Sequence, residues 1–133
     1  MDETDREILR ILEENGRKSY TEISEQVGVS EGTVRNRVQD LKDRGVIEKF
    51  TVEVREEEEM SAFVAVEIGT ESDPSEIYDE ISDDFEVFEV AGPLDAFVRV
   101  RGENSAEINR AVDRIRAVDG VSSTETYMVL NRR

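Results

Sequence analysis

Amide and guanidinium side chains gather between residues 30 and 39, where their types suit hydrogen bonding to nucleic-acid bases. Asn and Gln can pair with adenine, and Arg can pair with guanine or with a phosphate. Val34, Val38 and Leu41 recur at helical spacing and mark the side of a helix that would be buried. At about 100° per residue, Asn36 lies almost opposite that side. The pattern predicts a helix whose outward face reads DNA.

Nine residues in this helix and before it are the predicted DNA contacts. Gly32 leaves room for a base pair or for the DNA backbone, and Arg17 and Lys18 are candidate phosphate contacts just before another predicted helix. The full set is Arg17, Lys18, Ser30, Gly32, Thr33, Arg35, Asn36, Arg37 and Gln39. The alternative is a solvated polar helix face. Asp40 and Asp43 favour that alternative, because carboxylates repel phosphate.

Two further helices must hold the reading helix in place. Residues 3–15 carry apolar side chains at spacings of three and four, which predicts the first of them. Ser19 opens the second helix as its cap, and Gly28 turns the chain into Ser30, the cap of the reading helix. A helix, a short glycine-containing turn and another helix form the helix-turn-helix plan.

A predicted strand and a charged run separate this part of the chain from the rest. Residues 46–54 predict the strand, and the like-charge run at 55–59 is typical of a solvated linker. We therefore predict a helix-turn-helix DNA-binding domain over 1–50, a strand or linker over 51–60, and a second domain over 61–133.

The second domain is predicted to contain strands and helices in the order βαββαβ. Its helices begin after Asp73 and Asn104. Its strands are expected over 61–68, 85–91, 95–101 and 121–130. This order is the ferredoxin-like split βαβ unit, so the whole chain is predicted to be α+β. Both helices would cover one face of the sheet. The apolar residues of the other face would be covered by a second copy in a symmetric dimer, and the alternative is a monomer with a half-wet sheet.

The composition excludes several classes of function. The 133 residues include no Cys and no His, which excludes disulfides, thiol catalysis, zinc fingers and His-based acid–base chemistry. No catalytic residue, metal or cofactor is predicted. No apolar run approaches the ~20 residues of a membrane span, and the acidic N-terminus is unlike a secretory signal. We expect a soluble, cytoplasmic protein that does not bind membranes.

The chain is strongly acidic, with a net charge of −16, and only three of its 17 basic residues are Lys. This balance predicts a protein from a salt-loving archaeon. In molar salt the Debye length is only about 3 Å, so repulsion among surface carboxylates is screened. The alternative is a mesophilic acidic protein.

The N-terminal part of the chain carries a pattern of residue types that continues without a gap over about fifty residues. Its segments are Asp5–Leu9, Gly16–Ile23, Val27–Ser30, Val34–Val38, Leu41 and Gly45–Ile47. The pattern resembles the N-terminal domain of the Lrp/AsnC, or feast/famine, transcriptional regulators of bacteria and archaea. Ser24 departs from it, because the family usually has Ala there. A buried Ser at this position would bond back to its own helix.

The resemblance implies that the second domain, over 61–133, corresponds to the regulatory domain of this family. That domain is called the RAM domain, and its fold is similar to that of ACT domains. The resemblance implies a homodimer formed through the sheets, which often assembles into tetramers or octamers. It also implies small effectors, frequently amino acids, that bind between dimers. The family's marker loop is Gly-x-aromatic-Asp, and Leu94 replaces the aromatic residue here. The implied effector residues are Gly92, Pro93, Leu94, Asp95, Thr124 and Thr126. The alternative is that the loop is only a turn.

Three functions compete. The leading prediction is a sequence-specific DNA-binding transcriptional regulator that dimerises through the C-terminal sheet and responds to an amino acid or another small effector. Haem-pathway decarboxylases resemble the same architecture, but they are thought to use His, which this chain lacks, so we predict that it is not an enzyme. The third reading is a protein-interaction module without DNA binding. The carboxylates at 56–59 do not make a preformed cation site, because they lie in a flexible run.

Overall fold

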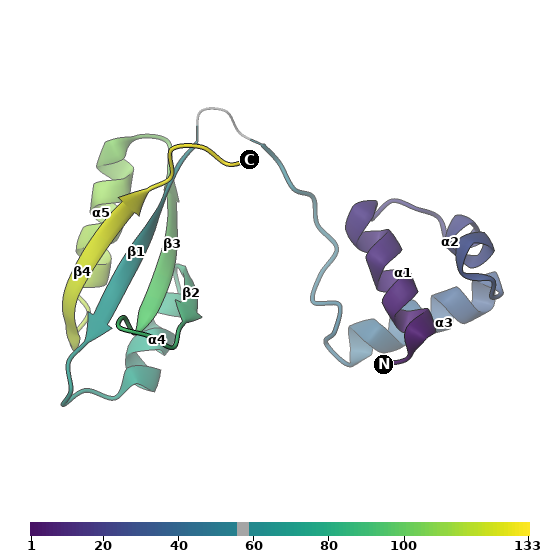
Figure 1. Cartoon of the computed structure of the whole chain (residues 1–133), viewed down its shortest axis with the longest axis horizontal. Coiled ribbons are helices and arrows are strands. Elements are labelled where there is room, and N and C mark those ends of the chain that lie inside the picture. The colour runs from purple at the N-terminus through teal and green to yellow at the C-terminus, as the bar shows by residue number, and fades with distance from the viewer. Residues whose placement is uncertain (56–58) are drawn as a thin grey trace. The chain divides into compact units, whose positions relative to one another are not determined.

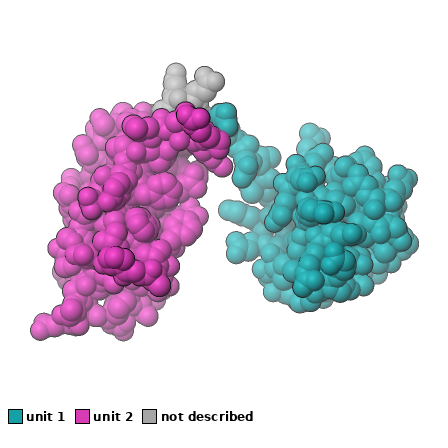
Figure 2. Space-filling view, in the orientation of Figure 1, with its two compact units in different colours: residues 1–55 teal, residues 56–133 magenta. Residues whose placement is uncertain are grey.

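The computed structural model describes all residues except 56–58. The chain divides into two compact units, Met1–Arg55 and Glu56–Arg133 (Figure 2). Figure 1 traces the helices and strands of each unit. The solvated run predicted at 55–59 falls largely on residues outside the described part of the chain.

Three helices form the first unit, as predicted. They are α1 (Glu3–Glu14), α2 (Tyr20–Val27) and α3 (Glu31–Asp43). Ser19 caps α2 by accepting the backbone N–H of Glu22, and Gly28 ends α2 at a φ of 82°, which glycine adopts without strain. A reciprocal capping box between Asp2 and Asp5 begins α1. Local sequence signals therefore determine where each helix begins.

The core of the first unit is a small apolar cluster between the three helices. Ile23, Val34 and Val38 are each at most 1% exposed. Burial of each such side chain contributes about 1.5–3 kcal/mol, which fixes the rotation of α3 about its axis. Ser24 is buried beside them, and its hydroxyl donates to the carbonyl oxygen of Thr21 at 2.7 Å. The predicted bond from Ser24 back to its own helix is thus confirmed.

The strand predicted over 46–54 is wrong. These residues are all described, and none of them lies in a strand. The backbone N–H groups of Val46 and Ile47 both donate to the carbonyl oxygen of Leu41, which closes the end of α3. Further along, Val52 stays 77% exposed. A strand needs a neighbour to pair its backbone groups, and the described residues of the first unit provide only helices.

The second unit has the predicted βαββαβ order. Its elements are β1 (Met60–Ile68), α4 (Pro74–Ser82), β2 (Glu86–Glu89), β3 (Ala96–Gly102), α5 (Ser105–Arg116) and β4 (Val121–Met128). The sheet is antiparallel throughout, in the order β2-β3-β1-β4. β2 is shorter than the predicted strand at 85–91, because its register with β3 covers only Glu86–Glu89.

Both helices of the second unit cover one face of the sheet, as predicted (Figure 1). Val64 and Val98 are fully buried beneath them, together with Ile108 and Ile115 of α5. Gly120, which precedes β4, has a φ of 98°, and its carbonyl oxygen accepts from the backbone N–H of Gly69 at 2.8 Å. Within the described part of the chain, no helix is long and apolar enough to cross a membrane.

The opposite face of the sheet is open and partly apolar. Phe63 pairs across the ladder with Tyr127, and Phe88 pairs with Phe97. In the single chain the exposed fractions of Phe63, Phe88 and Tyr127 are 37%, 44% and 50%. The predicted apolar face opposite the helices is therefore present.

Candidate nucleic-acid interface

Helix α3 is fixed by its cap and by its buried side. The Ser30 hydroxyl accepts the backbone N–H of Thr33 at 3.1 Å and lies 2.9 Å from the Thr33 hydroxyl. Val34, Val38 and Leu41 are at most 1% exposed. The hydroxyls of Ser30 and Thr33, both predicted DNA contacts, are thus part of the cap.

The polar residues that the sequence predicted for the outward face of α3 are found there. Asn36 and Gly32 are exposed. A Cβ added to Gly32 would lie 4.0 Å from the Ser30 hydroxyl oxygen, so this turn offers a close approach to its backbone. The Gln39 amide donates to Asp43 one turn later, at 2.9 Å. The outward face of α3 is therefore polar, and the major groove of DNA is wide enough to admit an α-helix.

Arg35 lies on the shoulder of α3 that faces α2. Its Nη2 donates to Oε1 of Glu31 at 2.8 Å, and its guanidinium lies 5.6 Å from the ring centroid of Tyr20. Oε2 of Glu31 in turn accepts from the Thr21 hydroxyl at 3.1 Å. The spacing of four residues between Glu31 and Arg35 is typical of an ion pair within one helix. The contacts to Tyr20 and Thr21 could not be predicted in this way, because those residues belong to α2.

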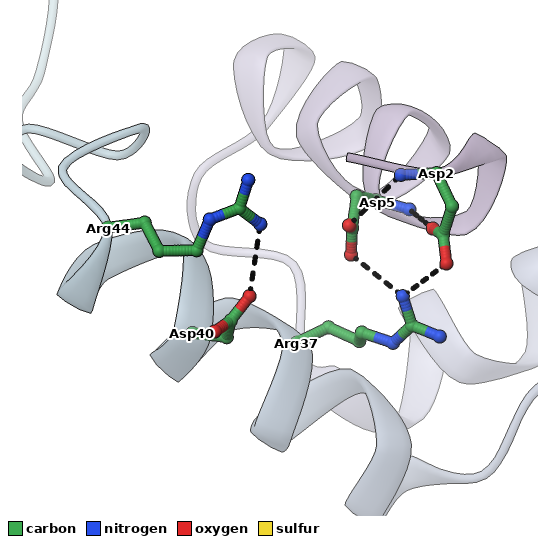
Figure 3. Close-up of polar contacts among 5 residues, drawn as sticks. All are labelled: Asp2, Asp5, Arg37, Asp40 and Arg44. Atoms are coloured by element: carbon green, nitrogen blue, oxygen red, sulfur yellow. Dashed lines mark hydrogen bonds and ion pairs between the residues drawn. The ribbon is translucent and has the colours of Figure 1, made fainter.

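Arg37 lies on the opposite shoulder and points to α1 (Figure 3). Its Nη1 forms ion pairs with Asp2 and, at 3.3 Å, with Asp5, whose side chain is only 5% exposed. The Asp5 backbone N–H and the Arg37 guanidinium both hold the pKa of Asp2 below its ordinary value of 3.8. The structure thus gives Arg37 a role in tying α3 to α1, which the sequence prediction did not include.

The two predicted phosphate contacts lie in the turn that precedes α2. Arg17 is exposed, and its backbone N–H donates to the Asn15 side chain at 3.0 Å. Lys18 is half-buried. Both residues stand close in sequence to Ser19, which caps α2, so they flank the helix that supports α3.

The predicted effector loop joins β2 to β3. Oδ2 of Asp95 accepts the backbone N–H of Ile68 at 2.8 Å, and the Asp95 carbonyl oxygen accepts from Val90 and from the Tyr78 hydroxyl. Burial raises the pKa of Tyr78, and the nearby charges of Asp95 and Glu89 raise it further. Asp95 therefore holds the ends of β1 and β2 and helix α4 together.

The two predicted effector threonines lie elsewhere in the unit. Thr124 and Thr126 are on β4, and β1 separates β4 from β3. The Thr124 hydroxyl accepts from Nε of Arg116 at 2.8 Å, so it faces α5. Within one chain the structure does not bring these threonines to the β2–β3 loop, and the effector site stays a prediction.

The chain is similar to known proteins in both of its units. The AsnC-type helix-turn-helix domain matches residues 1–42, and the Lrp/AsnC ligand binding domain matches residues 61–133. The chain is 38% identical over 133 residues to the HTH-type transcriptional regulator LysM of Saccharolobus solfataricus, covering 98% of this chain and 94% of LysM. It is 35% identical over 135 residues to the HTH-type transcriptional regulator FL11 of Pyrococcus horikoshii, covering 98% and 89%.

A solved structure gives the same result for the fold. The transcriptional regulator NMB0573 of Neisseria meningitidis, in complex with L-Met, aligns with a TM-score of 0.83 and 25% identity, covering 98% of this chain and 90% of that one. The resemblance noted from the sequence is confirmed over both units. The chain belongs to the Lrp/AsnC family of transcriptional regulators.

Proposed function

We propose that this regulator reads its operator with the outward face of α3, which enters the major groove. The carrying observation is the complete burial of Val34, Val38 and Leu41, which leaves Asn36 and Gly32 exposed on the other side. The Asn36 side chain can make two hydrogen bonds to an adenine edge. Gly32 has no side chain that would keep the helix backbone away from the DNA. Arg35, on the adjoining shoulder, brings a guanidinium within reach of a guanine or a phosphate.

The functional unit that we propose is a homodimer formed sheet against sheet. Phe63, Phe88 and Tyr127 are exposed on the open face of the second unit and would be covered by the same face of a second copy. Two DNA-binding units would then engage two half-sites. Once one DNA-binding unit of the dimer is bound, the other binds its half-site intramolecularly. The affinity of the dimer for the whole operator therefore exceeds that of a single unit.

We further propose that an amino acid regulates the assembly or its binding to DNA. The support is the match to a ligand binding domain and the L-Met complex of the Neisseria regulator. An effector can shift the protein only by binding two assembly or docking states with different affinity. The proposed contacts in this chain are the Gly92–Asp95 loop and, from another part of the assembly, Thr124 and Thr126.

The test begins with a selection. The full chain is incubated at high KCl with a pool of random duplexes, and the duplex that survives repeated rounds is titrated with wild-type protein and with variants. Asn36→Ala and Arg35→Ala are expected to lose preference for the selected duplex while light scattering still reports the wild-type assembly. Glu13→Ala, on the exposed surface of α1, serves as the control and is expected to bind like wild type. Unchanged binding by both α3 variants would show that this face does not read DNA.

A further inference from the structure

The carboxylate of Glu31 is held by two donors across the turn between α2 and α3. Its Oε1 accepts from Nη2 of Arg35 at 2.8 Å, and its Oε2 accepts from the Thr21 hydroxyl at 3.1 Å. The side chains of Arg35 and Glu31 remain 60% and 47% exposed. The contact therefore lies at the surface of the first unit, beside the proposed reading face.

A hydroxyl and a guanidinium are groups that proteins commonly offer to a DNA phosphate. Here both groups already face an anion of the protein itself. The Arg35 guanidinium is further held near the Tyr20 ring, at 5.6 Å from its centroid. A phosphate that approached this shoulder would have to displace Glu31 or accept its repulsion.

We propose that Glu31 is a specificity-determining residue, whose carboxylate takes the place of a DNA phosphate at Arg35 and Thr21. This inference rests on the proposed function, in which the outward face of α3 reads DNA. Phosphate contacts supply nearly all of the affinity for random DNA, whereas base contacts are added only at the operator. At the operator Arg35 would contact a base edge, whereas on random DNA it could contact only a phosphate, so an internal anion at this position weakens binding to random DNA more than binding to the operator.

Base reading by Arg35 is compatible with this contact. Glu31 accepts from Nη2 alone, and a guanidinium carries five N–H groups. The remaining N–H groups stay available for a base edge while the carboxylate fixes the orientation of the side chain. Glu31 thus removes a phosphate contact without removing a base contact.

A second carboxylate–arginine pair on α3 provides a matched control. Oδ2 of Asp40 lies 3.2 Å from Nη1 of Arg44, with side chains 55% and 46% exposed (Figure 3). This pair also has four-residue spacing, but both of its members belong to α3. Asp40→Asn therefore removes the same charge and frees an arginine in the same way, without changing the contact to α2.

The experiment compares two duplexes over a KCl series by fluorescence anisotropy, using the full chain. One duplex is selected from a random pool by the wild type, and the other is a shuffled duplex of the same composition. Glu31→Gln is expected to bind the shuffled duplex about three- to tenfold more tightly, with less than about a twofold gain on the selected duplex. The log–log salt slope on the shuffled duplex should steepen by about 0.9, the value for one additional phosphate contact.

The control separates this effect from net charge. Asp40→Asn should leave the ratio of the two affinities within about twofold of wild type, and circular dichroism should report equal helix content for all variants. Equal gains on both duplexes, or the same changes in Asp40→Asn, would overturn the proposed role of Glu31. A second outcome would also overturn the proposed role of Glu31: Glu31→Gln binds both duplexes like wild type. If the wild type still prefers the selected duplex and Arg35→Ala loses that preference, the proposed function would stand. Failure of the wild type to select any duplex would overturn the proposed function itself.

Discussion

The guanidinium of Arg37 on α3 contacts the carboxylate of Asp2, the cap of α1, which lies 35 residues earlier in the chain (Figure 3). One oxygen of Asp2 accepts the Asp5 backbone N–H, and the other accepts from Arg37. A single exposed carboxylate thus begins one helix and ties it to another. The charge of Asp2 therefore adds an ion pair between α1 and the proposed reading helix, beside the apolar contacts that the two helices share.

Asp2→Asn tests that dependence, because Asn caps a helix as well as Asp does but cannot form the ion pair. Folding lowers the pKa of Asp2, so its charge stabilises the folded state above the ordinary pKa of 3.8 and loses that effect as the pH falls through the lower, folded-state pKa. At pH 7 we expect a lower melting temperature for Asp2→Asn than for wild type. The difference should shrink in acid and vanish once Asp2 is protonated.

Circular dichroism melts from pH 7 downwards measure this difference. Glu3→Gln is the control, since Glu3 is exposed and lies 3.8 Å from Arg6 within the same helix. An exposed pair of this kind contributes little, so its melting curve should follow wild type at every pH. A constant gap between Asp2→Asn and wild type down to the lowest pH would show that the Asp2 charge does not matter.

Phe63→Asp tests the proposed dimer. Phe63 is 37% exposed in the single chain and pairs with Tyr127 on the open face of the sheet. If a second copy covers this face, the substitution buries an unpaired carboxylate in the interface, which is strongly unfavourable. Sedimentation should then report monomers at concentrations where the wild type is dimeric. Ala106→Asp adds the same charge to the exposed start of α5 and should leave the dimer intact.

Most of the fold followed from short-range patterns in the sequence. The spacing of Val34, Val38 and Leu41 is a local property, and it fixed both faces of α3. The signal that predicted a strand over 46–54 is local as well, but a strand also requires a partner, which no local pattern supplies. Contacts between distant residues were invisible for the same reason. Arg37 was predicted only as a DNA contact, because nothing in its own helix indicates Asp2 or Asp5 as partners.

Gly120→Ala is expected to destabilise the second unit by about 2–4 kcal/mol. The φ of Gly120 is 98°, and an added Cβ would overlap the Ile77 side chain and lie 3.0 Å from the Cβ of Ser72. The backbone cannot move away easily, because the Gly120 carbonyl oxygen bonds to Gly69. Urea unfolding followed by circular dichroism measures the change. Gly16→Ala is the control, since the nearest atom to its added Cβ would be a carbonyl oxygen at 3.7 Å, and it should change stability far less.

The melting temperature of the wild type is expected to rise with KCl. The net charge of −16 comes from an excess of carboxylates that repel one another when the chain is compact. The Debye length falls from about 30 Å at 0.01 M salt to about 3 Å at 1 M, so this repulsion disappears over that range. Sucrose at matched osmolarity stabilises by exclusion from the surface and does not screen charge, so it should produce a smaller rise. A melting temperature that is independent of KCl, or that rises equally in sucrose, would show that charge repulsion does not limit the stability of this chain.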